Sequence, residues 1–243
     1  MTDTSGLPPG LLPPLPAGGL KRFLERPRPK PAPGSVCEMC AEPIGDGHGH
    51  VVNLDARSLM CCCKGCTLLF SRQGAAGGRY KAVPTGTEMY DPRAAITAAQ
   101  WDSIQIPVNL AFFFLNSTLG RVVAFYPSPA GATESMLELD TWAEIMAANP
   151  ALADPEPDVE ALLVRKAARG ESPGFECWKV PIDACYELVG RVKRHWKGFD
   201  GGAELWADLD GFLDQLRERS RRVQGHADGH AEGHANGTGA RDA

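Results

Sequence analysis

The sequence predicts an α+β protein in which a small four-cysteine metal module precedes a domain with a mostly antiparallel sheet. Three observations lead to this prediction. Six of the eight cysteines lie within residues 37–66. Short β-rich runs are joined by turn residues, as in β-hairpins. Two helical patterns with one apolar stripe each follow the last of these runs. Because the hairpins and helices are segregated along the chain, the pattern favours α+β over an alternating parallel architecture.

The composition is that of an ordinary folded protein. The chain has 243 residues, 43% of them hydrophobic and 23% charged, with a net charge of −5. These fractions are close to the average of globular domains. A negative net charge argues against nucleic acid as a partner, since nucleic-acid-binding domains usually carry a basic surface.

Nothing in the sequence predicts a targeting or membrane segment. Prolines interrupt the leucines of residues 1–20, and Lys21 and Arg22 follow those leucines, whereas the basic residues of a signal peptide come first. The longest near-apolar run, residues 106–115, is much shorter than the roughly 18 residues that a membrane span needs. We therefore expect no membrane span and a cytoplasmic location.

The chain divides into five expected segments. Residues 1–34 are rich in proline and predict a disordered arm. The cysteine module is expected at 35–78, a linker with turn residues at 79–96, and the α+β domain at 97–222. Residues 223–243 repeat a Gly-His-Ala unit without core-forming side chains, and they predict a disordered tail.

The first half of the α+β domain should contain a helix, a hairpin and a second helix. Thr97 and Gln100 fit a capping box, which marks a helix start. Residues 106–115 predict a buried strand, and residues 121–126 predict its antiparallel partner, which the following proline should end. Thr141 should cap the next, short helix.

The second half should contain two strands and two helices. Strands are expected at 159–165 and 177–182. Asp183 should cap a helix whose apolar stripe runs from Cys185 to Trp196. The last helix should carry an apolar stripe over residues 205–216.

The cysteine spacing indicates a single metal site. Cys37-x-x-Cys40 is followed after 22 residues by Cys63-x-x-Cys66. Each such pair places two sulfurs on one side of an ion, and two pairs complete the tetrahedron that zinc prefers. A short hairpin is expected between the pairs, and a helical turn should follow the second one. This order of elements resembles a treble-clef zinc finger.

Three further residues are reserve ligands. Cys61, Cys62 and Cys63 are consecutive, and side chains alternate along an extended segment, so Cys61 and Cys63 should point one way and Cys62 the other. We therefore expect Cys62 to be packed or exposed and Cys61 to be the reserve for Cys63. His48 and His50 lie between the pairs, and either could replace a thiolate.

The identity and role of the metal remain open at this level. Structural zinc is the simplest interpretation, because a metal can replace the core of a module too small to fold alone. Iron, in a rubredoxin-like site or an iron–sulfur cluster, also binds four thiolates. A redox or sulfur-handling role for Cys61 or Cys62 is the third alternative.

The carboxyl-terminal tail contains a second, weaker candidate site. His226, His230 and His234 recur every four residues. Three imidazoles on a flexible chain can gather around Ni²⁺, Cu²⁺ or Zn²⁺. The simpler interpretation is a low-complexity tail without a metal.

Six sequence runs together resemble an uncharacterised bacterial family whose members are commonly encoded in gene clusters for high-affinity nickel–iron hydrogenases. The likeness covers about residues 35–220. Relatives usually have a different residue between the cysteines that match Cys61 and Cys63, which implies that Cys62 is dispensable and that Cys61 is a serious rival as ligand. The runs are residues 37–44 (CEMCAEPI), 50–55 (HVVNLD), 61–70 (CCCKGCTLLF), 111–114 (AFFF), 125–135 (FYPSPAGATES) and 181–190 (PIDACYELVG).

The expected function is that of a zinc-binding, non-enzymatic accessory protein. The resemblance implies protein partners, namely hydrogenase subunits or their maturation factors, and it supplies no reaction. The sequence shows no nucleophile elbow, phosphate loop or His-Glu-x-x-His motif. An electron carrier with iron on the same cysteines is one alternative, and an enzyme of unknown type with its active site between the two domains is another.

Overall fold

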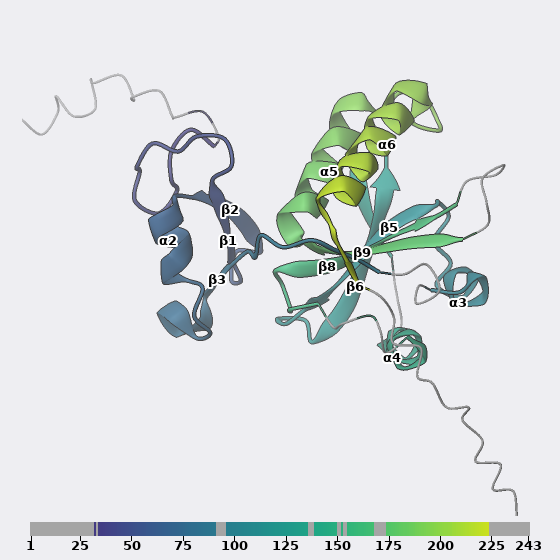
Figure 1. Ribbon diagram of the computed structural model, residues 1–243, viewed down its shortest axis with the longest axis horizontal. Coiled ribbons are helices and arrows are strands. Elements are labelled where there is room, and N and C mark those ends of the chain that lie inside the picture. The colour runs from purple at the N-terminus through teal and green to yellow at the C-terminus, as the bar shows by residue number, and fades with distance from the viewer. Residues whose placement is uncertain are drawn as a thin grey trace, which may run out of the picture.

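The computed structural model describes residues 32, 34–90, 96–135, 139–149, 152, 155–167 and 174–223. The arm expected at 1–34 and the tail expected at 223–243 therefore lie, except for residues 32, 34 and 223, outside the described residues. The described part has the expected α+β class, with two mostly antiparallel sheets (Figure 1). The cysteine cluster lies near its amino-terminal end. No helix in this part combines the length and apolarity that crossing a membrane demands.

The amino-terminal module is built on a three-stranded sheet. Strands β1 (Gly49–Asn53) and β2 (Ser58–Cys62) form the expected hairpin, and helix α2 (Lys64–Leu69) follows directly. A 3₁₀ turn, η1 (Ala75–Gly78), then leads to β3 (Tyr80–Ala82), which pairs with β1 in the order β2-β1-β3. The segment expected to be a linker from residue 79 thus completes this sheet.

The second sheet has seven strands in the order β10-β4-β9-β8-β5-β6-β7. All neighbours are antiparallel except β10 and β4, which run parallel. Strand β4 also comes from the expected linker, so both sheets draw on residues 79–96. The strands are β4 (Glu88–Tyr90), β5 (Leu110–Asn116), β6 (Arg121–Ser128), β7 (Gly131–Ser135), β8 (Glu160–Lys166), β9 (Phe175–Pro181) and β10 (Arg221–Val223).

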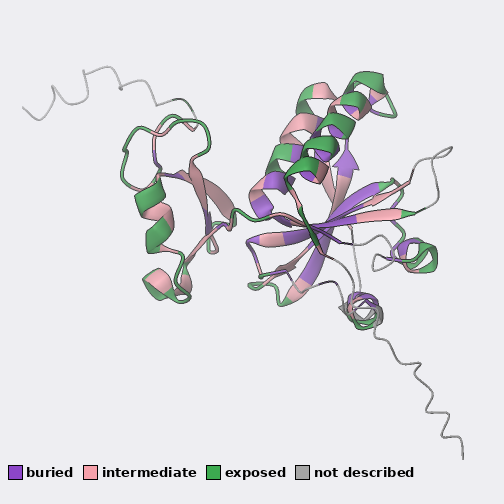
Figure 2. Ribbon diagram, in the orientation of Figure 1, coloured by how far each residue is buried: buried purple, intermediate pink, exposed green. Residues whose placement is uncertain are grey.

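Helices lie on both faces of the large sheet (Figure 1). Helices α5 (Ile182–His195) and α6 (Gly202–Arg219) cover one face, and α3 (Ala98–Ser103) and α4 (Leu139–Ala148) lie on the other. Along β5, Leu110 and Phe112 belong to the core under α5 and α6, whereas Ala111 and Phe113 belong to the opposite core. Because both faces are covered, the central strands are buried along most of their length (Figure 2).

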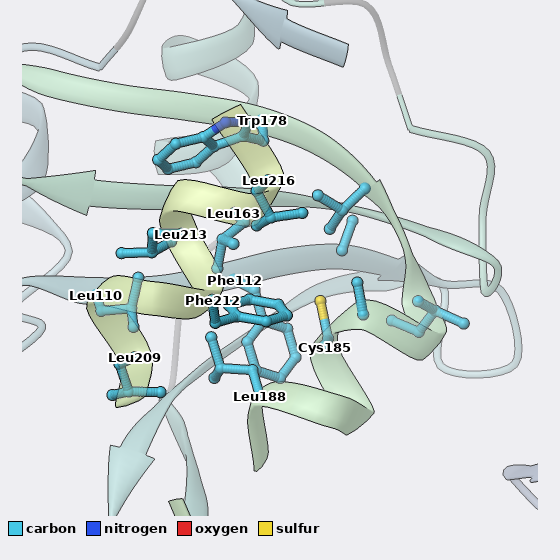
Figure 3. Packing of buried hydrophobic residues seen from close by; sticks show 14 of the residues in the cluster. Leu110, Phe112, Leu163, Trp178, Cys185, Leu188, Leu209, Phe212, Leu213 and Leu216 are labelled. Atoms are coloured by element: carbon cyan, nitrogen blue, oxygen red, sulfur yellow. The ribbon is translucent and has the colours of Figure 1, made fainter. Parts of the chain in front are cut away.

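The larger core lies between the sheet and the helix pair. Phe112, Leu163 and Trp178 from the strands meet Leu188 of α5 and Phe212 of α6 (Figure 3). The apolar stripe predicted for the last helix is fully buried there, since Leu205, Leu209, Phe212, Leu213 and Leu216 are each at most 2% exposed. The amphipathic pattern of the sequence is therefore confirmed for α6.

Several expected element boundaries were wrong. The first strand of the domain begins at Leu110, four residues later than expected. Strand β6 continues through Pro127, because pairing with β5 ends at Phe125 and the proline lies beside β7 only. Helix α4 begins at Leu139, so Thr141 lies inside it. In contrast, the capping box of Thr97 and Gln100 is confirmed.

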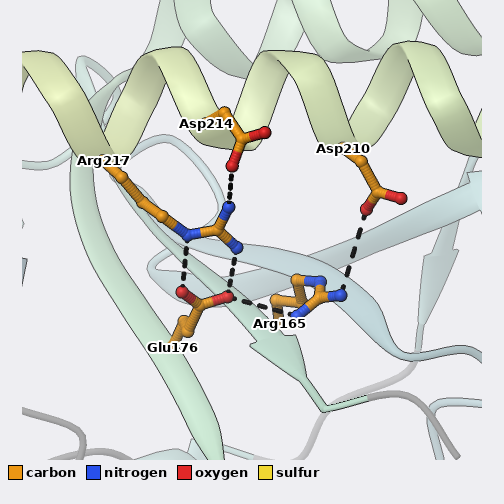
Figure 4. A network of polar contacts seen from close by, with 5 residues as sticks. All are labelled: Arg165, Glu176, Asp210, Asp214 and Arg217. Atoms are coloured by element: carbon orange, nitrogen blue, oxygen red, sulfur yellow. Dashed lines mark hydrogen bonds and ion pairs between the residues drawn. The ribbon is translucent and has the colours of Figure 1, made fainter. Parts of the chain in front are cut away.

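An ion-pair network fastens α6 to the sheet (Figure 4). Glu176 on β9 accepts hydrogen bonds from Nε and Nη2 of Arg217 at 2.7 and 2.6 Å, and from Nη1 of Arg165 at 3.3 Å. Asp214 pairs with Arg217, and Asp210 lies 3.9 Å from Arg165. The hydrogen bonds from Arg217 to Glu176 outweigh its partial burial and raise the pKa of this guanidinium. Bidentate pairs of this kind orient the helix on the sheet.

Glu88 forms two ion pairs near the edge of the large sheet. Its carboxylate pairs with Arg221 of β10 and with Nζ of Lys179 at 3.2 Å. Partial burial raises the pKa of Glu88, but these two partners lower it more, so the net shift is downward. A lowered carboxylate pKa stabilises the fold above the ordinary pKa of glutamate, and this contribution is lost as the pH falls through the lowered value.

Glu88→Gln should therefore lower the free energy of unfolding at neutral pH, and its difference from the wild type should shrink in acid. The measurement is urea unfolding of both proteins at a series of pH values. The difference should vanish as the pH falls through the lowered pKa of Glu88 and its carboxylate becomes protonated in the folded protein. Glu144→Gln, at an exposed position of α4, is the control and should change little at any pH. A Glu88→Gln deficit that persists undiminished in acid would contradict the prediction.

Candidate metal centre

The first cysteine pair lies in a tight turn that is held against the end of β2. The backbone N–H of Ala41 donates to the carbonyl of Cys37 at 2.8 Å, and the N–H of Cys37 donates to the carbonyl of Glu42 at 2.7 Å. Glu38 binds the end of β2 in both directions, because its N–H donates to the Cys61 carbonyl and its side chain accepts from the Cys61 N–H. This exchange fixes the turn beside the second pair.

The second pair lies at the start of α2. Cys63 is the N-cap residue, and its sulfur accepts a hydrogen bond from the backbone N–H of Cys66 at 3.4 Å. The cap gives the chain an extended residue followed at once by a helical turn, so the sulfurs of Cys63 and Cys66 face the same side. A helix at the second pair was expected and is present, but it begins at Lys64, inside the pair, and not after Cys66.

The four sulfurs of Cys37, Cys40, Cys63 and Cys66 all lie within 4.8 Å of one another. The sulfurs of Cys40 and Cys63 are 3.7 Å apart. A tetrahedron with metal–sulfur bonds of about 2.3 Å has edges of about 3.8 Å, so this spacing fits a single ion. All eight cysteines are free thiols in the structure. The cluster can therefore hold a metal ion.

The thiols of the cluster ionise unequally. Burial raises the pKa of Cys37, but hydrogen bonds from the backbone N–H groups of Cys63, Cys40 and Met39 outweigh it and lower the pKa to about 6. The pKa of Cys66 is raised, first by burial and then by hydrogen bonds with the neighbouring sulfurs. Four thiols this close compete for negative charge, and a dication removes the competition by binding all four as thiolates.

Cys62 is buried on the opposite face of the hairpin from Cys61. It is 0% exposed and packs in a small core with Val51 and Cys37. Burial, followed by the charge and hydrogen bonding of Cys37, raises its pKa to about 12. Cys62 thus contributes to packing, and it lies outside the group of four sulfurs.

Cys61 does not accompany Cys63, contrary to the expectation from strand alternation. It groups instead with His48 and His50, the other two reserve ligands. In the β1–β2 ladder Cys61 is the direct partner of His50, whereas Cys63 has left the strand to cap α2. The change from strand to helix between the two residues separates them. Burial and the nearby charge of Glu38 raise the pKa of Cys61.

Asp183 contributes to the site region in a way that no sequence pattern indicated. It was expected to cap α5, but that helix begins at Ile182 with Pro181 as its N-cap. The Oδ2 atom of Asp183 instead lies 2.8 Å from Nδ1 of His50. The two residues are 133 positions apart, so only the folded chain brings them together.

A pocket of about 590 Å³ lies where the module meets α5. His48, His50 and Asp183 line it, together with Glu187 and Arg219. Val52 and Val83 of the module join the same core as α5 and α6. The pocket is therefore bounded by packed elements of both sheets.

The remaining cysteines are core residues. Cys177 and Cys185 are 0% and 2% exposed. Burial alone raises the pKa of Cys177 to about 12, and burial raises that of Cys185 as well. Neither thiol is suited to act as a nucleophile. The candidate ligands His226, His230 and His234 lie outside the described residues.

Comparison with known proteins gives one match. A family model described as "Family of unknown function (DUF5947)" matches residues 36–220. No curated protein and no solved structure has significant similarity to the chain. The matched residues contain the cysteine cluster, the pocket and nearly all of both sheets. The chain therefore belongs to this family of unknown function, DUF5947.

Proposed function

We propose that the protein is a non-enzymatic accessory protein whose amino-terminal module is held together by a structural zinc ion. The main observation in its support is that the sulfurs of Cys37, Cys40, Cys63 and Cys66 lie close enough together to bind one ion. Four protein ligands leave no position for a substrate, which is typical of structural zinc and not of catalytic zinc.

The small size of the module supports a structural role for the metal. Its own core consists of three buried residues, Cys37, Val51 and Cys62, with partly buried neighbours. So few buried side chains stabilise a fold only weakly, and small domains commonly depend on a metal for this reason. The ion would hold the turn at Cys37–Cys40 against the start of α2.

The proposed partners are subunits or maturation factors of a nickel–iron hydrogenase. This part of the proposal depends on the resemblance of the six sequence runs. An exposed apolar surface on the module supports contact with another protein, because Leu68 and Leu69 of α2 are 61% and 68% exposed. Covering them would remove apolar surface from water.

Metal analysis tests the structural zinc site. Protein purified anaerobically should be colourless and contain zinc, and Co²⁺ substitution should produce the intense sulfur-to-metal absorption of a four-thiolate site. Visible absorption from iron in the purified protein would instead favour the electron carrier. Protein that binds no metal in any state would overturn the proposal.

Direct binding tests the partners. The zinc-loaded chain should bind a purified hydrogenase subunit or maturation factor from the same host, in a titration followed by calorimetry. Leu68→Asp combined with Leu69→Asp should weaken this binding if α2 forms the contact. The same double substitution should leave the zinc content unchanged, because neither side chain is a ligand. Absence of binding to every such protein would refute the hydrogenase link.

A further inference from the structure

The β1–β2 hairpin, which lies between the two cysteine pairs, presents a second group of metal ligands. One ring nitrogen of His48, one of His50 and the sulfur of Cys61 lie within 4.8 Å of one another. The set arises where β1 begins, since His48 immediately precedes this strand, His50 lies on it, and Cys61 is the cross-strand partner of His50. The rings of the two histidines meet edge to face, with their centroids 4.9 Å apart.

The hydrogen bonds of both imidazoles involve Nδ1 and leave Nε2 free for a metal. Nδ1 of His48 lies 2.9 Å from the carbonyl oxygen of Gly45, which can only accept a hydrogen bond. Nδ1 of His50 lies 2.8 Å from the carboxylate of Asp183, which also accepts. Each Nδ1 is therefore the donor, and the lone pair of each neutral ring lies on Nε2. Metal-binding histidines usually carry this kind of hydrogen bond on the other nitrogen.

One of these lone pairs is buried without a partner. Nε2 of His48 is inaccessible to solvent, and no residue that the structure describes hydrogen-bonds to it. Burying a nitrogen in this state costs free energy, because it has lost its hydrogen bond to water and makes none within the protein. A metal ion between the two rings and the Cys61 sulfur would satisfy it.

The local packing keeps this arrangement rigid. Gly49, between the two histidines, lies directly under α2, and a Cβ atom there would approach Oγ1 of Thr67 to 2.3 Å. Thr67 in turn donates to the carbonyl of Cys63 at 3.2 Å. The start of β1, beside the two histidines, is thus pressed against α2, the helix that carries Cys66. This contact explains the glycine at position 49.

We propose that His48, His50 and Cys61 form a second site, which binds a divalent transition-metal ion and keeps one coordination position open to the adjacent pocket. Two imidazoles and one thiolate suit Zn²⁺, Co²⁺, Cu²⁺ or Ni²⁺. Three protein ligands leave a tetrahedral ion with a fourth position. His48 and His50 line the pocket of about 590 Å³, and the open position is assigned to that side of the ion. Asp183 acts as a positioning residue through His50.

Titration of the metal-free full chain with Co²⁺ under reducing, anaerobic conditions tests the second site. The wild type should bind two equivalents, whereas His48→Ala and Cys61→Ala should each bind one and keep the four-thiolate spectrum. Cys62→Ala and His195→Ala, which change a cysteine and a histidine outside the group, should still bind two. Circular dichroism of each loaded variant checks that it is folded.

Two outcomes would overturn the second site. One is a wild type that binds a single equivalent and shows the four-thiolate spectrum. The other is that His48→Ala and Cys61→Ala still bind two equivalents of Co²⁺, or bind none. Variants that bind none would place these residues in the first site. Failure of the four-cysteine proposal is a separate result, because it would appear as loss of the four-thiolate spectrum from the wild type.

Two further measurements test the open position and the role of Asp183. Imidazole added to the chain with two Co²⁺ ions should shift the absorption spectrum of the second ion only, and a spectrum that does not change would refute the open position.

Asp183→Asn should lower the affinity of the second site for Co²⁺ by about 10–100-fold and leave the affinity of the first site unchanged. An equal loss of affinity at both sites would show that Asp183 affects folding in general and does not position the His50 ring.

Discussion

Cys37→Ser should abolish tight zinc binding and unfold the module around residues 34–83, while leaving the large sheet folded. Serine provides a harder oxygen donor that zinc seldom accepts in place of a thiolate, and Cys37 is the most buried member of the four, at 1% exposure. Binding of zinc to small modules is worth about 10–16 kcal/mol in peptide systems, which far exceeds what the small core can supply. Limited proteolysis should cut the variant within the module, and a chelator should reproduce that pattern in the wild type.

Cys62→Ala is the matched control for that experiment. It also removes a buried thiol from the module, but from a position outside the group of four sulfurs. It should keep one zinc ion at the four-cysteine site and resist protease in the presence of zinc. Equal metal loss in both variants would show that general packing, and not coordination, holds the module together.

Phe212→Ala should lower the free energy of unfolding by about 3–5 kcal/mol, as expected for an aromatic side chain removed from a closed core. Phe212 is 1% exposed between α5, α6 and the sheet (Figure 3). Its ring also lies under the guanidinium of Arg191, 5.3 Å from the ring centroid. Deletion therefore leaves a cavity and removes a cation–π contact. Urea unfolding of the zinc-loaded protein measures the change.

Phe199→Ala gives the comparison at a surface position. Phe199 is 100% exposed in the turn between α5 and α6, so the same chemical change removes no packing. Its effect on the unfolding free energy should stay within about 0.5 kcal/mol. Similar losses for the two variants would contradict the assignment of the core.

Features that depend on residues close in sequence could be predicted well. The Cys-x-x-Cys turns, the capping box at Thr97 and the apolar stripe of α6 each follow from local geometry or from a helical repeat. The α+β class followed from the segregation of these patterns. The grouping of Cys61 with the histidines was missed, although the expected hairpin between the cysteine pairs contained the signal. Pairing that hairpin in register would have placed Cys61 opposite His50.

The short edge strands could not be predicted, because their strand character comes from the partner and not from the sequence. Residues 131–135 read Gly-Ala-Thr-Glu-Ser and contain a single β-branched residue, Thr133, and no aromatic one, yet they pair with β6 over five positions. Strands β4 and β10 have three residues each and pair with each other from positions about 133 apart. Asp183 likewise acquires its contact with His50 only through the tertiary fold.

The connection between the two sheets has a mechanical consequence. Only residues 83–87 separate β3 from β4, so the module cannot move far from α5. A tether this short keeps facing groups at a high effective concentration, and contacts too weak to join separate molecules then persist. The bond from Lys81 to the Pro157 carbonyl, at 2.8 Å, is one of them. Any event that loosens the module, such as loss of its ion, should therefore increase the mobility of β4, the first strand of the neighbouring sheet.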